Sequence, residues 1–293
     1  MKHHKNVPYY IIMFFLALSA VFCLVPLIST VALSFSSAYA ANTGQVYFWP
    51  VEFTLSPYRL ILDDNQFFTS FGISIVRVLI GGTLNVLFAI IMAYPLSKSP
   101  SVFRAKTKYM WFCVFLWLFP PGMIPLFVLI NNIGMINSMW ALVLPGAVPI
   151  FSVIILMNFF KGIPLELEES ALIDGAGQWR ILWQIFVPLA TPSIAVIALW
   201  AVVGHWNDFF SGLIYFTDRT RWPLQTYIQS LSLTIDHNQI AHMDPAQLKA
   251  IWETTGITFN SARVVIAMIP VLLVYPFLQR YFVKGIVMGA VKG

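Results

Sequence analysis

The segment Glu169–Pro188, with the sequence ESALIDGAGQWRILWQIFVP, lies between two strongly apolar blocks of the chain. It begins inside a short helix that Pro164 can open, because proline suits the first helical position. Asp174-Gly175 predicts the end of this helix, because glycine readily adopts the left-handed conformation found after a helix. The first turns carry three acidic residues, which the helix dipole favours there: Glu166, Glu168 and Glu169.

A second helix is expected directly after the glycine turn. Its apolar residues recur at helical spacing and would share one face: Trp179, Leu182, Ile185 and Phe186. Pro188 predicts its end. The segment as a whole therefore predicts a helix, a glycine turn and a second helix, set outside the bilayer.

The composition places the chain in a membrane. Of its 293 residues, 59% are hydrophobic and 10% are charged, whereas soluble domains carry about 25% charged residues. The net charge of +5 does not indicate a nucleic-acid partner, because the basic residues form no stripe. Neither a metal site nor a disulfide is predicted, since Cys23 and Cys113 both fall in apolar runs and are expected to be buried thiols.

Six apolar stretches are long enough to cross a bilayer, which requires about 20 residues each. They cover residues 10–35, 68–96, 109–130, 139–160, 191–216 and 264–281, and the polar segment 161–190 separates the fourth from the fifth. Prolines in the third and fourth stretches predict kinked helices whose freed carbonyl groups neighbouring helices can satisfy. The sequence thus predicts an all-α polytopic membrane protein whose single transmembrane domain covers residues 1–293.

The distribution of basic residues predicts the orientation in the membrane. With six spans, both termini lie on one side. That side carries eleven basic residues: Lys2, Lys5, Lys98, Arg104, Lys106, Lys108, Lys161, Arg180, Arg280, Lys284 and Lys292. The other side carries five: Arg59, Arg219, Arg221, Lys249 and Arg263. Because cytoplasmic loops carry the excess of Lys and Arg, we expect both termini and the segment 161–190 to be cytoplasmic.

The helix–turn–helix resembles the EAA loop of ABC importer permeases. That loop reads E-A-A, three residues, G, nine residues, I-x-L-P, and this chain has Glu169-Ser170-Ala171, Gly175 and Ile185–Pro188 at the same spacing. Ser170 replaces the first alanine and Val187 the leucine, which are small or apolar changes. The resemblance implies a coupling helix that docks into a cleft on an ATPase subunit, formed by Glu169, Ser170, Ala171, Asp174, Gly175 and Ala176.

The C-terminal tail, Gln279–Ile286 and Gly289–Gly293, resembles that of carbohydrate-importer permeases of the second type, like the shorter permease of the maltose importer. The resemblance implies the type I ABC importer permease fold in a bacterial cytoplasmic membrane. It also implies a second homologous permease, two ATPase subunits and an extracytoplasmic solute-binding protein. No G-x-x-x-x-G-K-[ST] sequence occurs in this chain. ATP and magnesium would therefore bind to the ATPase subunits, and this chain would be neither an enzyme nor a cofactor protein.

Polar residues in the fifth apolar stretch are candidates for the translocation path. They are His205, Trp206, Asn207 and Asp208. Polar groups at this depth are costly and usually line a pathway or hold helices together, and both interpretations stay open here. An indole face suits a sugar ring, and the W-N-D triplet also resembles the fifth span of sugar importers. Two further runs, Gly122–Pro125 and Tyr275–Gln279, look like the branch that imports uronate oligosaccharides, including alginate fragments.

The second apolar stretch contains polar residues and a pair of glycines that also bear on function. Arg77 is a cation inside this stretch; it can contact an anionic substrate, but extension towards the interface or pairing with a carboxylate is the favoured interpretation. Gly81-Gly82 predicts a close approach between helices, and Asn85 an interhelical hydrogen bond.

Other functions fit less well. An ion-coupled secondary sugar transporter needs carboxylates at mid-membrane, for which Asp208 is the candidate, and no inverted repeat is evident. A membrane enzyme would be expected to carry a motif such as H-E-x-x-H or G-x-S-x-G, and neither occurs. An ABC permease for a non-sugar solute, such as an amino acid or peptide, is disfavoured by the tail and the W-N-D triplet. We therefore expect half of a translocation path for an oligosaccharide.

Overall fold

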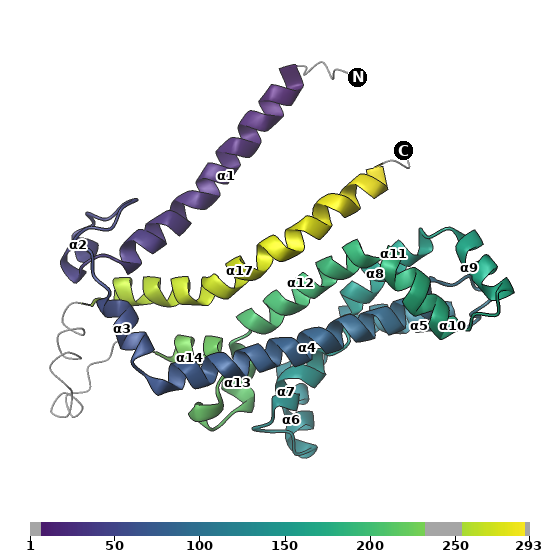
Figure 1. The fold of residues 1–293 in the computed structure, drawn as a ribbon. Helices are drawn as coiled ribbons and strands as arrows, with labels where there is room; N and C mark the ends of the chain where they lie inside the picture. Colours follow the sequence, from purple (N-terminus) through teal and green to yellow (C-terminus); the bar gives the residue numbers. More distant parts are fainter. Residues whose placement is uncertain (1–6, 232–253, 291–293) are drawn as a thin grey trace. The chain divides into compact units, whose positions relative to one another are not determined.

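The computed structural model describes residues 7–231 and 254–290, with side chains for residues 9–231 and 254–276. Within these ranges all regular structure is helical and no strand occurs (Figure 1). The all-α prediction is therefore confirmed. Four of the basic residues used to predict the orientation lie outside the described part: Lys2, Lys5, Lys249 and Lys292. The side chains of residues 277–293, which include the C-terminal tail, are also outside it.

The chain folds as two compact units. The first comprises residues 1–68 and 230–269, and the second comprises residues 69–229 and 270–293. The first unit holds α1 (Val7–Ser34), α2 (Ala38–Asn42) and α3 (Ser56–Leu62). Two long helices, α4 (Asn65–Ser97) and α17 (Gly256–Ala290), continue from one unit into the other. The cavity and the helix–turn–helix described below belong to the second unit.

In the first unit, the segment after α1 is fixed by aromatic and hydroxyl contacts. The ring of Phe35 stacks on those of Phe53 and Tyr58, with centroids 5.6 and 4.8 Å apart. The Tyr58 hydroxyl donates a hydrogen bond to Ser34 Oγ at 2.8 Å. The helix α1 itself keeps its apolar faces exposed within the chain. Cys23 on α1 is accordingly exposed, so the buried-thiol prediction is wrong for Cys23 and confirmed for Cys113.

Three of the described helices are long and apolar enough to cross a membrane as single helices: Tyr9–Ser34, Asn65–Ser97 and Gly256–Pro276. Three further apolar stretches are bent pairs of helices, which bring the number of candidate spans in the described ranges to as many as six. The first pair is α5 (Lys106–Leu118) with α6 (Met123–Asn132), bent by 107°. The second joins α7 (Met139–Val143) and η1 (Leu144–Gly146) to α8 (Ile150–Lys161) at 46°.

Proline and glycine explain these breaks. Pro120-Pro121 supplies no backbone donors, and Gly122 between α5 and α6 has a φ of +81°, which glycine adopts without strain. Pro145 lies within η1 and Pro149 immediately precedes α8. The third pair, in which α12 (Thr191–Asn207) follows the helix–turn–helix, bends by 83° beside Pro192, which lies in the first turn of α12.

The predicted helix–turn–helix is present, and its second helix contains a π-helical segment. The first helix, α9, covers Leu165–Ile173 and is followed by Gly175 at a φ of +79°, so Asp174-Gly175 does end it. The second run comprises α10 (Gln178–Ile181), the π-helix η2 (Leu182–Phe186) and α11 (Val187–Leu189). The run ends at Leu189, one residue after Pro188, which was expected to end it. Pro188 itself lies in α11, which continues directly from the π-helix η2.

The core of the second unit lies where α4, α8 and the run α10–α12 pack together. Three aromatic rings meet edge to face at its centre: Tyr94, Phe160 and Phe186, with centroids 5.0 to 6.4 Å apart. Leu182 and Phe186 of the expected stripe are buried in this cluster, together with Ile181. Trp179, which was expected to belong to the same stripe, is 63% exposed. A helix stripe inferred from spacing alone assumes a regular α-helix, and the π-helix η2 changes the register of the stripe.

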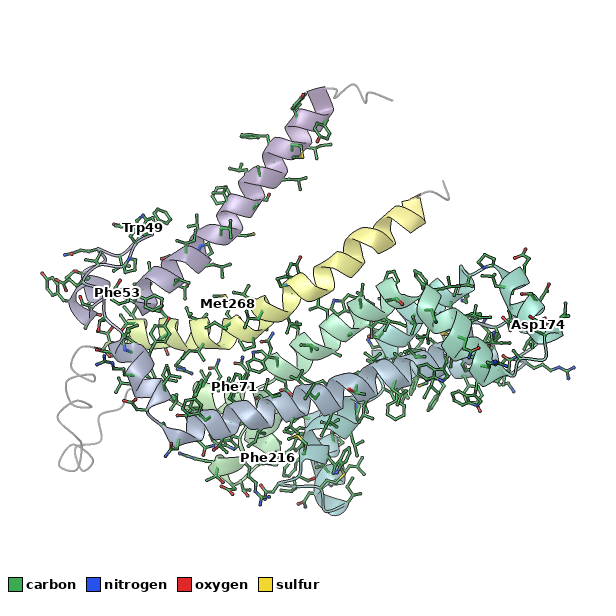
Figure 2. All side chains as sticks on the ribbon, viewed as in Figure 1. Trp49, Phe53, Phe71, Asp174, Phe216 and Met268 are labelled. Atoms are coloured by element: carbon green, nitrogen blue, oxygen red, sulfur yellow. The ribbon has the colours of Figure 1, made fainter. Side chains whose placement is uncertain are left out.

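The remaining elements of the second unit are short: α13 (Phe210–Tyr215), the 3-10 turn η3 (Arg219–Arg221) and α14 (Leu224–Ser230). Figure 2 shows Asp174, at the turn between α9 and α10, at one end of this unit, away from Phe71 and Phe216. The helix–turn–helix and the α13 region thus lie far apart, with α4 and α12 running between them.

Candidate functional site

A buried ion pair joins α4 to the end of α12. Arg77 on α4 is 2% exposed, and its guanidinium pairs with the carboxylate of Asp208, the residue that follows α12. The same guanidinium donates to the backbone oxygen of Asp208 at 2.8 Å and to that of Leu142 on α7 at 3.5 Å. Arg77 is therefore paired with a carboxylate, as the favoured interpretation expects, and it links three elements.

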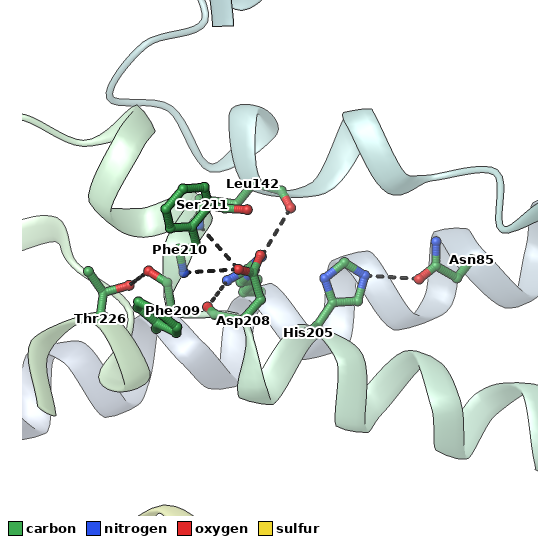
Figure 3. A network of polar contacts seen from close by, with 9 residues as sticks. Asn85, Leu142, His205, Asp208, Phe209, Phe210, Ser211 and Thr226 are labelled. Carbon is green, nitrogen blue, oxygen red and sulfur yellow. Dashed lines mark hydrogen bonds and ion pairs between the residues drawn. The ribbon is translucent and has the colours of Figure 1, made fainter. Parts of the chain in front are cut away.

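Asp208 also organises the helix that follows it (Figure 3). While its Oδ2 faces Arg77, its Oδ1 accepts the backbone N–H groups of Phe210 and Ser211, both at 3.1 Å. These are first-turn donors of α13, which have no partners within the helix. The carboxylate thus accepts hydrogen bonds on both oxygens, and its charge is balanced by Arg77.

A second polar contact, between His205 and Asn85, lies about one turn before Asp208 on α12. His205 Nε2 and Asn85 Oδ1 are 2.9 Å apart (Figure 3). The Asn85 amide nitrogen donates to the backbone oxygens of Gly146 and Ala147 at 2.7 and 3.1 Å. Because these two bonds orient the amide with its oxygen towards the ring, Nε2 is the histidine nitrogen that carries the hydrogen. Asn85 therefore satisfies carbonyl groups freed at the break before α8, as expected for an interhelical hydrogen-bonder.

Gly81 allows the close approach of α4 and α12. A Cβ atom at this position would overlap the ring of His205, whereas a Cβ at Gly82 would meet no atom within 4 Å. The close approach predicted from the glycine pair is thus confirmed, and Gly81 is the residue that requires it.

These groups surround a cavity of about 330 Å³ in the second unit. Its polar lining comes from four elements: Arg77, Asn85, Ser152, His205, Asp208 and Ser211. Trp206, by contrast, is 3% exposed and packs edge to face against Phe71, and Asn207 is exposed elsewhere on α12. Helical geometry explains this division, because residues 205 and 208 share one face of α12 and residues 206 and 207 turn away from it.

Trp200 is a cavity residue that the sequence analysis missed. It lies on the cavity wall, and its ring stacks on that of Phe151 with a centroid distance of 5.4 Å. Phe151 in turn stacks on Trp117 at 5.9 Å, so a row of three half-exposed rings runs from α5 through α8 to α12. The spacing of Trp200, Gly204 and Asp208 at i, i+4 and i+8 could have revealed the shared face.

The predicted coupling residues divide into two groups. Glu169, Ser170, Asp174 and Gly175 are exposed. Ala171 and Ala176 are half-buried and pack against the core cluster, and the Ala176 N–H donates to the Ala171 oxygen at 2.9 Å to close the turn. The exposed face also carries large apolar side chains, and Ile173 beside the turn is 87% exposed. An exposed apolar patch with acidic neighbours is typical of a protein-binding surface.

Glu168, one residue before the predicted motif, is a buried residue that the sequence analysis did not select. It forms an ion pair with Lys98, which directly follows α4, with Nζ and Oε1 2.5 Å apart. Burial lowers the pKa of Lys98, and the neighbouring Glu168 opposes that change. The sequence could not show which glutamate of α9 is buried, because Glu166, Glu168 and Glu169 all suit the first turns of a helix equally well.

Comparisons with known proteins also indicate a membrane component of a transport system. A family model described as a binding-protein-dependent transport system inner membrane component matches residues 85–288. Protein LplC of Bacillus subtilis (strain 168) is 37% identical over 270 residues, which cover 92% of this chain and 90% of LplC. YtcP of the same strain, a polygalacturonan/rhamnogalacturonan transport system permease protein, is 36% identical and covers 95% of this chain and 96% of its own length.

A solved structure shares the fold over almost the whole length. It is the crystal structure of a bacterial ABC transporter involved in the import of the acidic polysaccharide alginate. One of its chains superposes with a TM-score of 0.82 at 28% identity, covering 96% of this chain and 99% of that one.

Proposed function

Because the chain belongs to the family of binding-protein-dependent transport system inner membrane components, we propose that it forms half of the translocation path of an ABC importer for an acidic oligosaccharide. The observation that carries the proposal is the agreement between two independent relatives. YtcP is named for polygalacturonan and rhamnogalacturonan, and the structural neighbour takes part in alginate import. Galacturonan and alginate are both polymers of uronic acids, so their fragments share a pyranose ring that bears a carboxylate.

The cavity supplies the contacts that this substrate class needs. A sugar ring presents C–H groups on its faces and hydroxyl groups at its edges. The ring of Trp200 can stack on such a face, and His205 and Ser211 can hydrogen-bond to the hydroxyl groups. The substrate carboxylate is not expected to bind Arg77, because Asp208 already neutralises this cation. We therefore assign Arg77 to the cavity wall rather than to the recognition of charge.

Coupling to ATP hydrolysis is assigned to α9, the Gly175 turn and α10. We propose that their exposed face, with Glu169, Ser170, Asp174 and Ile173, docks into a cleft on an ATPase subunit. ATP and magnesium then bind to two such partner subunits, and this chain supplies neither catalytic residues nor a cofactor site. Closure of the ATPase dimer pulls the helix–turn–helix, the spans tilt, and the path opens towards the binding protein.

The assembly and orientation follow from the same assignment. We propose that residues 1–293 form one transmembrane domain in the cytoplasmic membrane, with both termini and the segment 161–190 on the cytoplasmic side. A second homologous permease completes the path, and an extracytoplasmic solute-binding protein delivers the sugar. The alternative of an ion-coupled secondary transporter is not favoured, because the candidate carboxylate of Asp208 is occupied by Arg77 and by two backbone N–H groups.

The proposal is tested by purification of this chain with its associated subunits and by ATPase assays across a panel of oligosaccharides. Two ATPase chains and a second permease should co-purify. The binding protein loaded with oligogalacturonides or alginate oligosaccharides should stimulate ATP hydrolysis, and neutral maltodextrins should not. Stimulation by maltodextrins alone would overturn the acidic class, and transport driven by an ion gradient without ATPase subunits would overturn the family mechanism.

The role of the cavity is tested by Trp200→Ala. We expect a severalfold lower maximal transport rate with an unchanged affinity of the binding protein for the sugar, because stacking on an aromatic ring contributes about 1 kcal/mol. Trp200→Phe, which keeps an aromatic face, should retain most of the rate. Trp179→Ala removes a tryptophan outside the cavity, and it should lower the stimulation of ATPase activity by the loaded binding protein. A Trp200→Ala transporter with the wild-type rate would remove this residue from the path.

A further inference from the structure

One glutamate of α9 differs in environment from its two neighbours. Glu166 and Glu169 are exposed, whereas Glu168 is buried and pairs with Lys98. The paired side chains are 8% and 11% exposed, and their charged atoms are 2.5 Å apart. Glu168 therefore points into the permease, while the neighbouring glutamates face outwards. A pair this well buried leaves an uncompensated charge if either partner is lost.

The Lys98 ammonium group is also held by aromatic rings. Its Nζ lies 3.9 Å from the ring centroid of Tyr94 on α4 and 4.5 Å from that of Phe186 on η2. A cation over an aromatic face is attracted to it electrostatically, and more strongly where water is excluded. The Tyr94 hydroxyl in turn donates a hydrogen bond to Gln178 Oε1 on α10 at 2.7 Å. The last turn of α4 thus contacts α9, α10 and η2 through polar or charged groups.

The backbone at Lys98 is fixed as well. The Lys98 carbonyl accepts a hydrogen bond from Lys106 Nζ at 2.5 Å, which ties the end of α4 to the start of α5. Asn85 and Arg77 lie earlier in α4, where they bind the backbone of the α7–η1 segment and the carboxylate of Asp208. One continuous helix therefore carries the contact to α9 at one end and the cavity contacts in its middle.

We infer that Lys98 and Glu168 are positioning residues that form the joint through which α9 moves α4. The inference rests on the proposed function, in which the ATPase subunits pull the helix–turn–helix. A close-packed contact transmits displacement instead of absorbing it. An ion pair enclosed by two rings also resists sliding between the two helices. Movement of α9 is then passed to α4, and through Asn85 and Arg77 to the walls of the cavity.

The first test uses Glu168→Gln and Lys98→Met in the assembled transporter, with Glu166→Gln as the matched control on the same helix. The measured quantity is the ratio of ATPase activity with and without a binding protein loaded with oligogalacturonide, together with transport per ATP. We expect the ratio to fall on the order of tenfold in each single variant, which is within the range for residues that couple two sites. The control should keep the wild-type ratio.

Two further variants separate a joint from a general packing role. Lys98→Arg keeps the charge and the attraction to the rings, so it should retain most of the stimulation. The double variant Lys98→Met/Glu168→Gln should be no more impaired than either single variant, because both changes break the same contact. Independent, multiplicative losses in the double variant would overturn the inference. Single variants with wild-type transport per ATP would overturn it too.

A covalent bridge gives a second measurement, in which a crosslink replaces the ion pair. Cys23 and Cys113 are the only cysteines of the sequence, so Cys23→Ser/Cys113→Ser provides a background for Lys98→Cys/Glu168→Cys. The unbridged double-cysteine variant should lose stimulation, and a short thiol-reactive linker between the two cysteines should restore it if α9 and α4 move together. Stimulation that stays absent after bridging would show that the two helices must separate, and the joint would be excluded.

The outcomes distinguish this inference from the proposed function. A wild-type complex that is not stimulated by any loaded binding protein would overturn both. Normal stimulation of the wild type, with equally stimulated Glu168→Gln and Lys98→Met variants, would overturn the joint and leave the proposed function intact.

Discussion

At the scale of single residues, the cavity depends on a charge that has been removed from solvent. The Arg77 guanidinium is enclosed by Asp208 and two backbone oxygens, and it therefore fixes the end of α12 against α4 and α7. Loss of one partner of a buried pair costs more than the pair contributes, because the remaining charge keeps its desolvation penalty.

The first prediction concerns this pair. Arg77→Met should destabilise the purified transporter by about 3 kcal/mol, since Asp208 is left without its counter-ion. Arg77→Met/Asp208→Asn should recover part of the loss. The measurement is thermal unfolding of the detergent-solubilised complex. Arg221→Gln is the control, because Arg221 and Asp218 form an exposed pair at 3.9 Å, and such pairs contribute little. Equal effects at both sites would contradict the structural importance of Arg77.

The second prediction uses the adjacent glycines of α4. Gly81→Ala places a methyl group against the His205 ring, so α4 and α12 must separate or the ring must turn. We expect a loss of stability of about 1–3 kcal/mol, as is usual for overpacking. Gly82→Ala, with no atom near the added group, should lose nothing and can gain from better helix propensity. The two variants are compared by thermal unfolding, and equal stabilities would refute the close approach.

At the scale of elements, the turn between α9 and α10 determines how the exposed coupling face is presented. Its conformation depends on Gly175, which has a φ of +79°, and a Cβ atom added at this residue would meet no other atom within 4 Å. A side chain at this position therefore meets backbone strain rather than a clash within the chain. The direction in which Asp174 and Ile173 project follows from this turn.

The third prediction is that Gly175→Val abolishes transport and removes the stimulation of ATPase activity by the loaded binding protein. A β-branched residue in the left-handed region costs about 1–2 kcal/mol, and the turn changes shape to avoid that cost. Gly175→Asn should retain more activity, since asparagine tolerates this conformation.

A matched control for that prediction lies two residues away. Gly177 is equally exposed but has an extended backbone, with a φ of −73° and a ψ of 161°. Gly177→Val should therefore leave the backbone of the turn unchanged and impair transport less than Gly175→Val. Intact, substrate-stimulated ATPase activity in Gly175→Val would contradict the coupling role of the turn.

At the scale of the whole molecule, the proposed function requires the helix–turn–helix to face the cytoplasm. The excess of basic residues on its side of the predicted spans supports that orientation. Several of these residues, including Arg104 and Lys108, are exposed on the described part of the chain. An element that receives force from an ATPase cannot function from the opposite side of the membrane.

The fourth prediction tests this orientation by labelling. In a Cys23→Ser/Cys113→Ser background, single cysteines at the exposed positions Ser170 and Trp179 should react with a membrane-impermeant maleimide only after the membrane is opened. A cysteine at the exposed Gln45, in the segment between α2 and α3, should react in intact cells. Labelling of Ser170→Cys or Trp179→Cys from outside would exclude the proposed contact with ATPase subunits.

The sequence by itself determined the membrane class, the helical fold and the place of the helix–turn–helix. These properties depend on local chemistry: the lengths of the apolar stretches, the positions of prolines, and a glycine that ends a helix. The spacing of Glu169, Gly175 and Pro188 indicated a family before any contact between helices was known.

Only the tertiary structure decided which polar side chains meet. Arg77 pairs with Asp208, Asn85 with His205, and Lys98 with Glu168, and each pair joins segments that are far apart along the chain. The sequence analysis selected Trp206 as the sugar-stacking candidate, but packing buries Trp206 against Phe71 and places Trp200 at the cavity instead. The physical reason is that hydropathy indicates which segments lie in the membrane. The partner of each polar side chain depends instead on the rotation and spacing of the packed helices.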